Sequence, residues 1–107
     1  MQQDRDIVIQ KIKDIASPIL PEGSKVLLYG SRARGDARED SDWDVLVVVN
    51  KSDIEQSDYR TIVYPITAIG WDIEEMIIPV IYTKKEWEDN SFTPFYKNVE
   101  KEGIVIV

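Results

Sequence analysis

The chain has 107 residues, of which 43% are hydrophobic. This length fits one compact domain over residues 1–107 and is too short for two well-packed cores. Its formal charge of −7 argues against an extended grip on nucleic acid, because domains that track phosphates are usually basic. The sequence contains no cysteine and no histidine, which excludes disulfides, thiolate metal sites and imidazole catalysis.

The first predicted element is an amphipathic helix over about residues 3–16, in which Val8, Ile12 and Ile15 share one face. The residues before it are polar and lack the apolar core of a signal peptide. No apolar run in the sequence approaches the ~20 residues of a membrane span. We therefore expect a cytoplasmic protein that does not enter a membrane.

Two strands separated by a turn are predicted next. Lys25–Tyr29 is a short apolar run that suits a buried strand, and Gly30 ends it. The stretch over residues 31–37 is either a short helix or a loop. Trp43–Val49 is rich in β-branched residues, which favour a second strand.

A helical region is predicted between about residues 52 and 70. Ser52 and Glu55 have the spacing of a capping box, and helical periodicity continues up to Gly70. Pro65 interrupts this periodicity, so the pattern indicates either a kink or a shorter helix.

A third strand is predicted over Met76–Tyr82. Pro79 cannot donate a ladder hydrogen bond, which places this strand at a sheet edge or a bulge. Thr83 and Glu86 then repeat the capping-box spacing and predict a short helix. The last expected elements are a helix over residues 95–101 that stops near Gly103 and a terminal strand over residues 104–107.

Several large aromatic side chains lie in the second half of the sequence. Burial is the usual way in which aromatic residues stabilise a protein. We therefore expect these side chains to be core or partner-facing anchors rather than base-stacking residues: Trp71, Trp87, Phe92, Phe95 and Tyr96.

The turn after the first strand has the composition of a phosphate-binding loop. Gly30 permits a sharp exit and a close approach of the backbone to a ligand, and the amides that follow can converge on phosphate oxygens. Ser31 adds a hydroxyl, while Arg32 and Arg34 offer charged donors. The two arginines are also ordinary solubilising residues, so this loop alone is a weak signal.

Two carboxylates stand at the entrance of the second strand. The period of two in a strand puts Asp42 and Asp44 on one face and Trp43 on the other. Paired carboxylates repel each other unless a cation or proton lies between them, and their hard oxygen atoms favour magnesium or manganese. The alternative is a turn, because Ser and Asp are common in loops that lead into strands.

Taken in order, the two motifs resemble a known family. Gly30-Ser31-Arg32-Ala33-Arg34-Gly35 followed by Ser41-Asp42-Trp43-Asp44 is similar to the signature of the polymerase-beta-like nucleotidyltransferase superfamily. The compact chain resembles the minimal nucleotidyltransferases of that superfamily. The motif covers about residues 25–49, and the order of the surrounding elements agrees over most of the chain.

The resemblance implies an α+β fold, with a small mixed β-sheet and flanking helices. It implies that Gly30, Ser31, Arg32 and Arg34 bind the triphosphate, and that the catalytic pair of Asp42 and Asp44 binds Mg²⁺ or Mn²⁺. The implied activity is the transfer of a nucleoside monophosphate, AMP from ATP, to an acceptor hydroxyl.

One departure from the family pattern lies in the third strand. The family places another carboxylate there, which helps to activate the acceptor, and the corresponding position falls near Ile78. Asp72, Glu74 and Glu75 lie upstream and would substitute for it only if the register shifted. A solvated acidic turn is the simpler interpretation of these three residues.

Two functions therefore remain open. The resemblance implies an enzyme whose acceptor is a partner protein, such as a small helical HEPN-type toxin that the chain neutralises as an antitoxin. The alternative is a catalytically weak, nucleotide-binding antitoxin or regulatory subunit that acts by protein binding. Ile78 favours the second hypothesis, whereas the intact Asp42 and Asp44 favour the first. An aminoglycoside nucleotidyltransferase is a poorer match, because such enzymes generally carry an additional helical domain.

Overall fold

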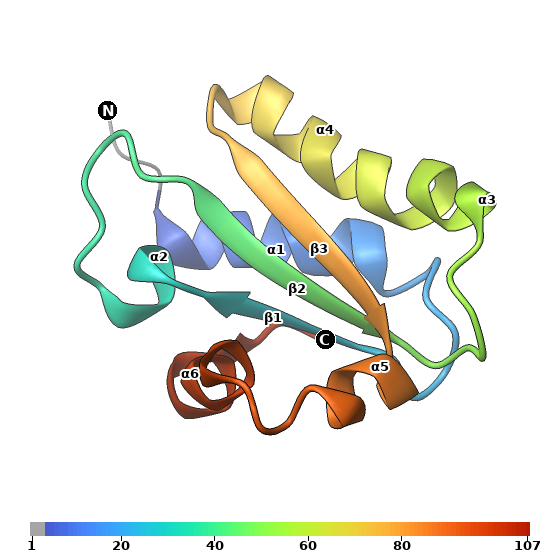
Figure 1. Cartoon of the computed structure of the whole chain (residues 1–107). Coiled ribbons are helices and arrows are strands. Elements are labelled where there is room, and N and C mark those ends of the chain that lie inside the picture. The colour runs from blue at the N-terminus through green and yellow to red at the C-terminus, as the bar shows by residue number, and fades with distance from the viewer. Residues whose placement is uncertain (1–3) are drawn as a thin grey trace.

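The computed structural model describes residues 4–107 and shows a twisted sheet with helices on both of its faces (Figure 1). The elements in chain order are α1 (Arg5–Ala16), β1 (Lys25–Tyr29), α2 (Ser31–Arg34), β2 (Trp43–Val49), α3 (Gln56–Asp58), the π-helical segment η1 (Tyr59–Val63), α4 (Tyr64–Ile73), β3 (Ile77–Thr83), α5 (Lys84–Asp89), α6 (Pro94–Glu102) and β4 (Ile104–Val105).

The four strands form a mixed sheet in the order β3-β2-β1-β4. Strand β1 pairs antiparallel with both β2 and β4, whereas β3 runs parallel to β2. Strand β2 has neighbours on both sides, and its residues Val45–Val49 are all buried. This architecture confirms the predicted α+β fold with a mixed sheet and flanking helices.

The sheet separates two apolar clusters. On one face, the cluster of β1 and β2 side chains packs against α1 and α4, with Ile12 and Ile66 fully buried. On the other face, Leu46 and Val48 pack against Trp87 of α5 and Val99 of α6. Asp44 has the same strand parity as Leu46 and Val48, so it lies on the α5 and α6 side of the sheet.

Helix α1 begins where the Asp4 side chain accepts hydrogen bonds from the amides of Asp6 and Ile7. The predicted start at residue 3 lies outside the described residues. Val8 and Ile12 are buried, whereas Ile15, on the same predicted helical face, is 40% exposed. The reason is its position at the rim of a groove between α1 and α4.

The second helical region starts later than its sequence suggests. Glu55, rather than Ser52, caps α3, and the carboxylate of Asp58 accepts a hydrogen bond from the Glu55 amide in return. The interruption expected at Pro65 is a change of helical type, because η1 immediately precedes the first turn of α4, where Pro65 lies. Proline is tolerated in a first turn, since its missing amide has no partner to lose there.

The C-terminal half follows its predicted order closely. Strand β3 is an edge strand, as Pro79 indicated, and the Thr83 hydroxyl accepts from the Glu86 amide in the predicted capping box. Helix α6 ends at Gly103, and Ile106 continues the pairing beyond β4 by donating its amide to the Val26 carbonyl. Across residues 4–107, every helix is too short or too polar to cross a membrane.

Candidate active site

The loop between β1 and α2 packs directly against a carboxylate of β2. Gly30 has φ of 75°, a left-handed conformation that residues with a side chain rarely adopt. A Cβ atom at this position would lie 2.5 Å from Oδ2 of Asp44. Two features therefore require glycine at position 30: the left-handed backbone conformation and the close approach to Asp44.

Helix α2 forms a single turn directly after this glycine. The amides of Ala33 and Arg34 donate to the Gly30 carbonyl, and the chain leaves the helix at Gly35 with φ of 85°. The amides of Ser31 and Arg32 come earlier in the turn, where an α-helix offers no internal acceptor. These two amides and the Ser31 hydroxyl are therefore suited to an anionic ligand.

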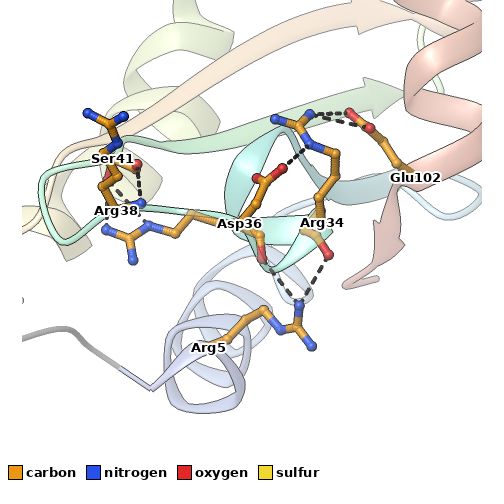
Figure 2. Close-up of polar contacts among 8 residues, drawn as sticks. Arg5, Arg34, Asp36, Arg38, Ser41 and Glu102 are labelled. Carbon is orange, nitrogen blue, oxygen red and sulfur yellow. Dashed lines mark hydrogen bonds and ion pairs between the residues drawn. The ribbon is translucent and has the colours of Figure 1, made fainter.

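Two cationic side chains hold α2 in place. Figure 2 shows Arg5 of α1 reaching the carbonyl end of the helix, where its Nη1 donates to the carbonyls of Arg32 and Ala33 at 3.2 and 3.1 Å. Arg34 extends to the other side and pairs with Asp36 at 3.1 Å and with Glu102 of α6 at 3.2 Å. The loop is therefore tied to both the first and the last long helices.

Arg32 differs from Arg34 in being almost completely buried, with 3% of its surface exposed. Its guanidinium donates to the Ser41 carbonyl at 2.8 Å and to the Glu39 carbonyl at 3.3 Å. It also lies 4.5 Å from the ring centroid of Trp43 and 3.7 Å from the carboxylate of Glu75. Binding a phosphate would require Arg32 to leave these partners, whereas exposed Arg34 has no such barrier.

The Arg32 contacts fix the connector that carries the first carboxylate. The Ser41 carbonyl belongs to the residue immediately before Asp42, and the Ser41 hydroxyl in turn accepts from the Arg38 amide at 2.8 Å (Figure 2). Trp43 is buried on the opposite side of β2, as the alternation predicted. Asp42 is consequently exposed at the mouth of the site, between two anchored residues.

The two predicted carboxylates influence each other electrostatically. Partial burial raises the pKa of Asp44, and the negative charge of Asp42 raises it further. The positive charge of Arg34 acts in the opposite direction and lowers the pKa of Asp44. The structure thus brings Asp42, Asp44 and Arg34 close enough to interact.

Asp44 has different neighbours on its two sides in the sheet. Tyr29 of β1 lies beside it in the antiparallel ladder, and Ile78 of β3 lies beside it in the parallel ladder. Burial, then the charge of Asp44, raises the pKa of Tyr29 to about 12, with a smaller contribution from Tyr82. The Tyr29 ring also packs edge-on against Phe95.

No acidic residue of the upstream turn occupies the position beside Asp44. Glu75 is directed to Arg32, and Asp72 lines the groove between α1 and α4. Glu74 ends α4 in a left-handed conformation and is exposed. Ile78 therefore stands where the family resemblance implied a third carboxylate, and the parallel register makes this assignment direct.

The donor set fits a hard divalent cation. Asp42 and Asp44 offer carboxylate oxygens close enough for the charge of one to raise the pKa of the other, which a bound cation would relieve. Within residues 4–107, no group of three or more acidic, histidine or cysteine side chains converges. Magnesium commonly binds proteins through one or two carboxylates and completes its shell with phosphate oxygens and water. The pair therefore suits a metal that arrives with a nucleotide.

Some residues that shape this site were not found from the sequence. Arg5 and Glu102 anchor the loop from distant positions, and no local motif marks them. Glu75 was considered only as a substitute carboxylate or as part of a solvated turn, whereas it pairs with buried Arg32. Tyr29 was predicted as the last residue of the first strand. Its place beside Asp44 follows only from the pairing of β1 with β2.

The structure thus packs a glycine loop against Asp44 at one end of the central strands β1 and β2, with Asp42 exposed beside it, as the resemblance to nucleotidyltransferases implies. The sequence model of the family described as "Nucleotidyltransferase domain" matches residues 9–106. The chain belongs to this family and is a nucleotidyltransferase. This membership confirms the predicted resemblance to the minimal enzymes of the polymerase-beta-like superfamily.

Individual relatives agree with this assignment. A protein of Methanocaldococcus jannaschii described as a "putative protein adenylyltransferase" is 31% identical over 102 residues, which cover 94% of this chain and 96% of that protein. A crystal structure described as a "toxin-antitoxin with AMP-PNP" has a TM-score of 0.63 at 16% identity, covering 92% of this chain and 72% of its own. A "putative nucleotidyltransferase from Sulfolobus solfataricus" has a TM-score of 0.58 at 20% identity, covering 94% and 80%. These two structures share the fold of the chain.

Proposed function

We propose that the chain transfers AMP from ATP to a hydroxyl group of a partner protein in the cytoplasm, with magnesium or manganese. The observation that carries this proposal is the contact between the Gly30 loop and Asp44, with Asp42 within electrostatic reach. This contact supports the proposal because the amides that would bind phosphate lie next to the carboxylates that would hold the metal.

Each residue of the site has a separate task in this proposal. The Ser31 and Arg32 amides, together with the Ser31 hydroxyl, would bind the triphosphate, and Arg34 would exchange its exposed carboxylate partners for phosphate oxygens. Asp42 and Asp44 would hold the metal, which when bound offsets the charge that develops on the attacking and leaving oxygens. We assign the buried Arg32 side chain to holding the Ser41 carbonyl, and through it Asp42, rather than to the phosphates.

The reaction is a substitution at the α-phosphorus. The acceptor oxygen forms a new bond to this phosphorus, the bond to the bridging oxygen of the β-phosphate breaks, and pyrophosphate leaves. The acceptor proton passes to water, because Ile78 offers no base on β3. The chain's own contribution is to position the reactants and stabilise charge.

A protein acceptor is favoured by the relatives. The Methanocaldococcus jannaschii relative is described as acting on protein, and one structural neighbour is a toxin-antitoxin complex with a nucleotide analogue. On the family resemblance, we propose a HEPN-type toxin as the partner, with the chain as its antitoxin. The second candidate is a nucleotide-binding antitoxin with little catalysis, and the apolar Ile78 beside Asp44 is the observation that favours it.

The deciding experiment measures magnesium-dependent transfer of label from ATP labelled at the α-phosphate, in a lysate of the source organism. The wild type is compared with Asp42→Asn and Asp44→Asn, which we expect to lower transfer by about 10²–10³-fold, the usual cost of removing a group that stabilises transition-state charge. The midpoint temperature of thermal unfolding should be unchanged or slightly higher for Asp44→Asn, because burial and the charge of Asp42 both disfavour a charged carboxylate at this position.

The outcomes separate the two candidates. A labelled product that needs Asp42 and Asp44 supports the transferase, and its mass identifies the acceptor class. If the wild type binds ATP but yields no product, the nucleotide-binding antitoxin is the better conclusion. Variants that unfold would instead indicate that the carboxylates have a structural role.

A further inference from the structure

An apolar surface lies on the β3 side of the candidate active site, where α4 meets the start of β3. It lines a hollow of about 520 Å³. Trp71 is 75% exposed and Met76 is 61% exposed, although large apolar side chains usually gain stability from burial. We call it the β3-edge surface and define it by Tyr64, Thr67, Trp71, Met76, Ile78 and Pro79.

Two positions of this surface offer no free donor to a partner. Tyr64, Thr67 and Trp71 have the spacing of one helical stripe on α4. The Thr67 hydroxyl donates to the Val63 carbonyl within the helix, and Pro79 has no amide hydrogen. What remains for a partner is mainly apolar contact, which is the character of a protein interaction site.

The β3-edge surface is continuous with the site where transfer is proposed. Ile78 belongs to it and is paired in register with Asp44 on the neighbouring strand. Adjacent strands lie about 5 Å apart, so Ile78 lies one strand spacing from Asp44 on the α5 and α6 face of the sheet. Helix α4 covers the opposite face, so the surface reaches Ile78 around the β3 edge. A protein held on this surface can therefore present a hydroxyl to the site.

The charges around the surface favour a basic partner. Glu74 lies two residues before Met76 and is exposed, and exposed Asp72 follows Trp71 but faces the groove between α1 and α4. The exposed Arg60 lines a neighbouring hollow with Tyr64. Asp42 is exposed at the mouth of the site, and the whole chain carries a formal charge of −7. A second copy of the chain would bring the same negative charges against these residues, which is unfavourable.

Extension of the sheet by a partner strand is also disfavoured. The Trp43 amide donates to the Met76 carbonyl, so alternation turns the backbone groups of Ile77, Pro79, Ile81 and Thr83 away from β2. Pro79 has no donor, and the Thr83 amide is already bonded to the Glu86 carboxylate. A partner strand would therefore find no free amide at two of these four positions, which weakens pairing along this edge.

We infer that the β3-edge surface is the docking site of the acceptor protein, which covers Trp71 and Met76 with apolar side chains and surrounds them with basic residues. This inference rests on the proposed transfer to protein and adds where the acceptor binds and by which chemistry. Ile78, which stands where the family places a carboxylate, then forms part of an apolar contact with the acceptor.

The test uses the labelled-transfer assay with the Trp71→Ser/Met76→Ser double variant. Phe92→Ser is the matched control, because Phe92 is 74% exposed and does not line the hollow. We expect the double variant to label the protein acceptor at least about tenfold more slowly in dilute lysate, as for truncation of an interface hot spot. Concentrated lysate should restore most of the rate, because the loss is in acceptor binding. ATP binding and thermal unfolding should match the wild type in both variants.

Each result bears on a different claim. Undiminished labelling by the double variant would overturn the docking site while leaving the transferase intact. An absence of label with the wild type would overturn the proposed transfer to protein and the docking site together. A wild-type homodimer in sedimentation that the double variant converts to a monomer would assign the surface to a second copy and overturn the inference.

The charge of the partner is tested separately with Asp72→Lys/Glu74→Lys. If basic residues of the acceptor surround its contact with this surface, the variant should label the acceptor more slowly in dilute lysate. Added salt should reduce the difference in labelling rate between the variant and the wild type. Faster labelling by the reversed variant would contradict a basic partner.

Discussion

The two sides of Asp44 are built in opposite ways. On the β1 side, Gly30 contacts its carboxylate, and the loop beyond is anchored by arginines to α1, α6 and the Asp42 connector. On the β3 side, Ile78 lies beside it without a polar group, and Trp71 and Met76 are exposed nearby.

This difference suggests a division of labour in the proposed reaction. The nucleotide side is held by contacts within the chain, so the Gly30 loop and Asp44 are in place before a ligand arrives, and only Arg34 would change its partners. The acceptor side presents apolar surface that gains stability when another molecule covers it. In this proposal the chain by itself builds the nucleotide half of the site, and the acceptor protein completes the other half.

The largest expected effect is on the anchored side and concerns Arg32. Arg32→Met removes the buried guanidinium and leaves the Glu75 carboxylate and two connector carbonyls without it. We expect the free energy of unfolding to fall by about 3–5 kcal/mol, the usual cost of breaking a buried ion pair from one side. Chemical denaturation monitored by tryptophan fluorescence measures this change.

Arg32→Lys is the matched control for the shape of this group. Lysine keeps the charge but lacks the planar fork that reaches the Ser41 and Glu39 carbonyls, so an intermediate loss is expected. If the methionine variant lost less than about 1 kcal/mol, as for a typical surface ion pair, the connector would not depend on Arg32.

A smaller effect should distinguish two glycines of the same loop. Gly30 and Gly35 both have positive φ, so alanine at either position should cost about 1–2 kcal/mol of stability. Alanine at Gly30 also displaces the Asp44 carboxylate, whereas nothing lies within 4 Å of a Cβ at Gly35. We expect Gly30→Ala to lower transfer by about 100-fold, since small misplacements of catalytic groups have such effects. Equal activities of the two variants would show that the Asp44 position tolerates movement.

The smallest expected effect comes from a substitution on the apolar side of Asp44. Ile78→Asp puts a carboxylate beside Asp44, where it can accept a proton from water. We expect the rate of ATP hydrolysis to AMP and pyrophosphate to rise about tenfold, which is less than the rate gain from an optimised general base. Ile78→Asn has nearly the same size without a base and should not raise it. A rise with both variants, measured as pyrophosphate release, would mean that access of water rather than a base limits the reaction.

Local patterns predicted most of the secondary structure. The strands at Lys25–Tyr29 and Trp43–Val49 and the capping box at Thr83 have strong short-range signals, and the structure has them at those positions. The start of the second helical region was predicted less well, because Ser52 and Glu55 have the right spacing but Glu55 and Asp58 make the hydrogen bonds. Propensity cannot choose between two nearby caps when tertiary packing decides where the helix begins.

Long-range contacts were beyond the sequence. Nothing in the local pattern distinguishes buried Arg32 from exposed Arg34, two residues later, since both are arginines in the same short loop. The difference arises because Arg32 faces the connector, Trp43 and Glu75, which lie up to 43 residues away in the chain and meet only in the folded sheet.

The sequence by itself determined the chemistry available to this protein: a glycine turn after a buried strand, and two carboxylates spaced by two on the next. Those features depend on backbone conformation and strand alternation, which are local. The tertiary structure decided which arginine is buried, that Ile78 is the neighbour of Asp44, and that Trp71 and Met76 remain uncovered. These outcomes depend on how strands pair and helices pack, and such contacts between distant residues leave no local signature.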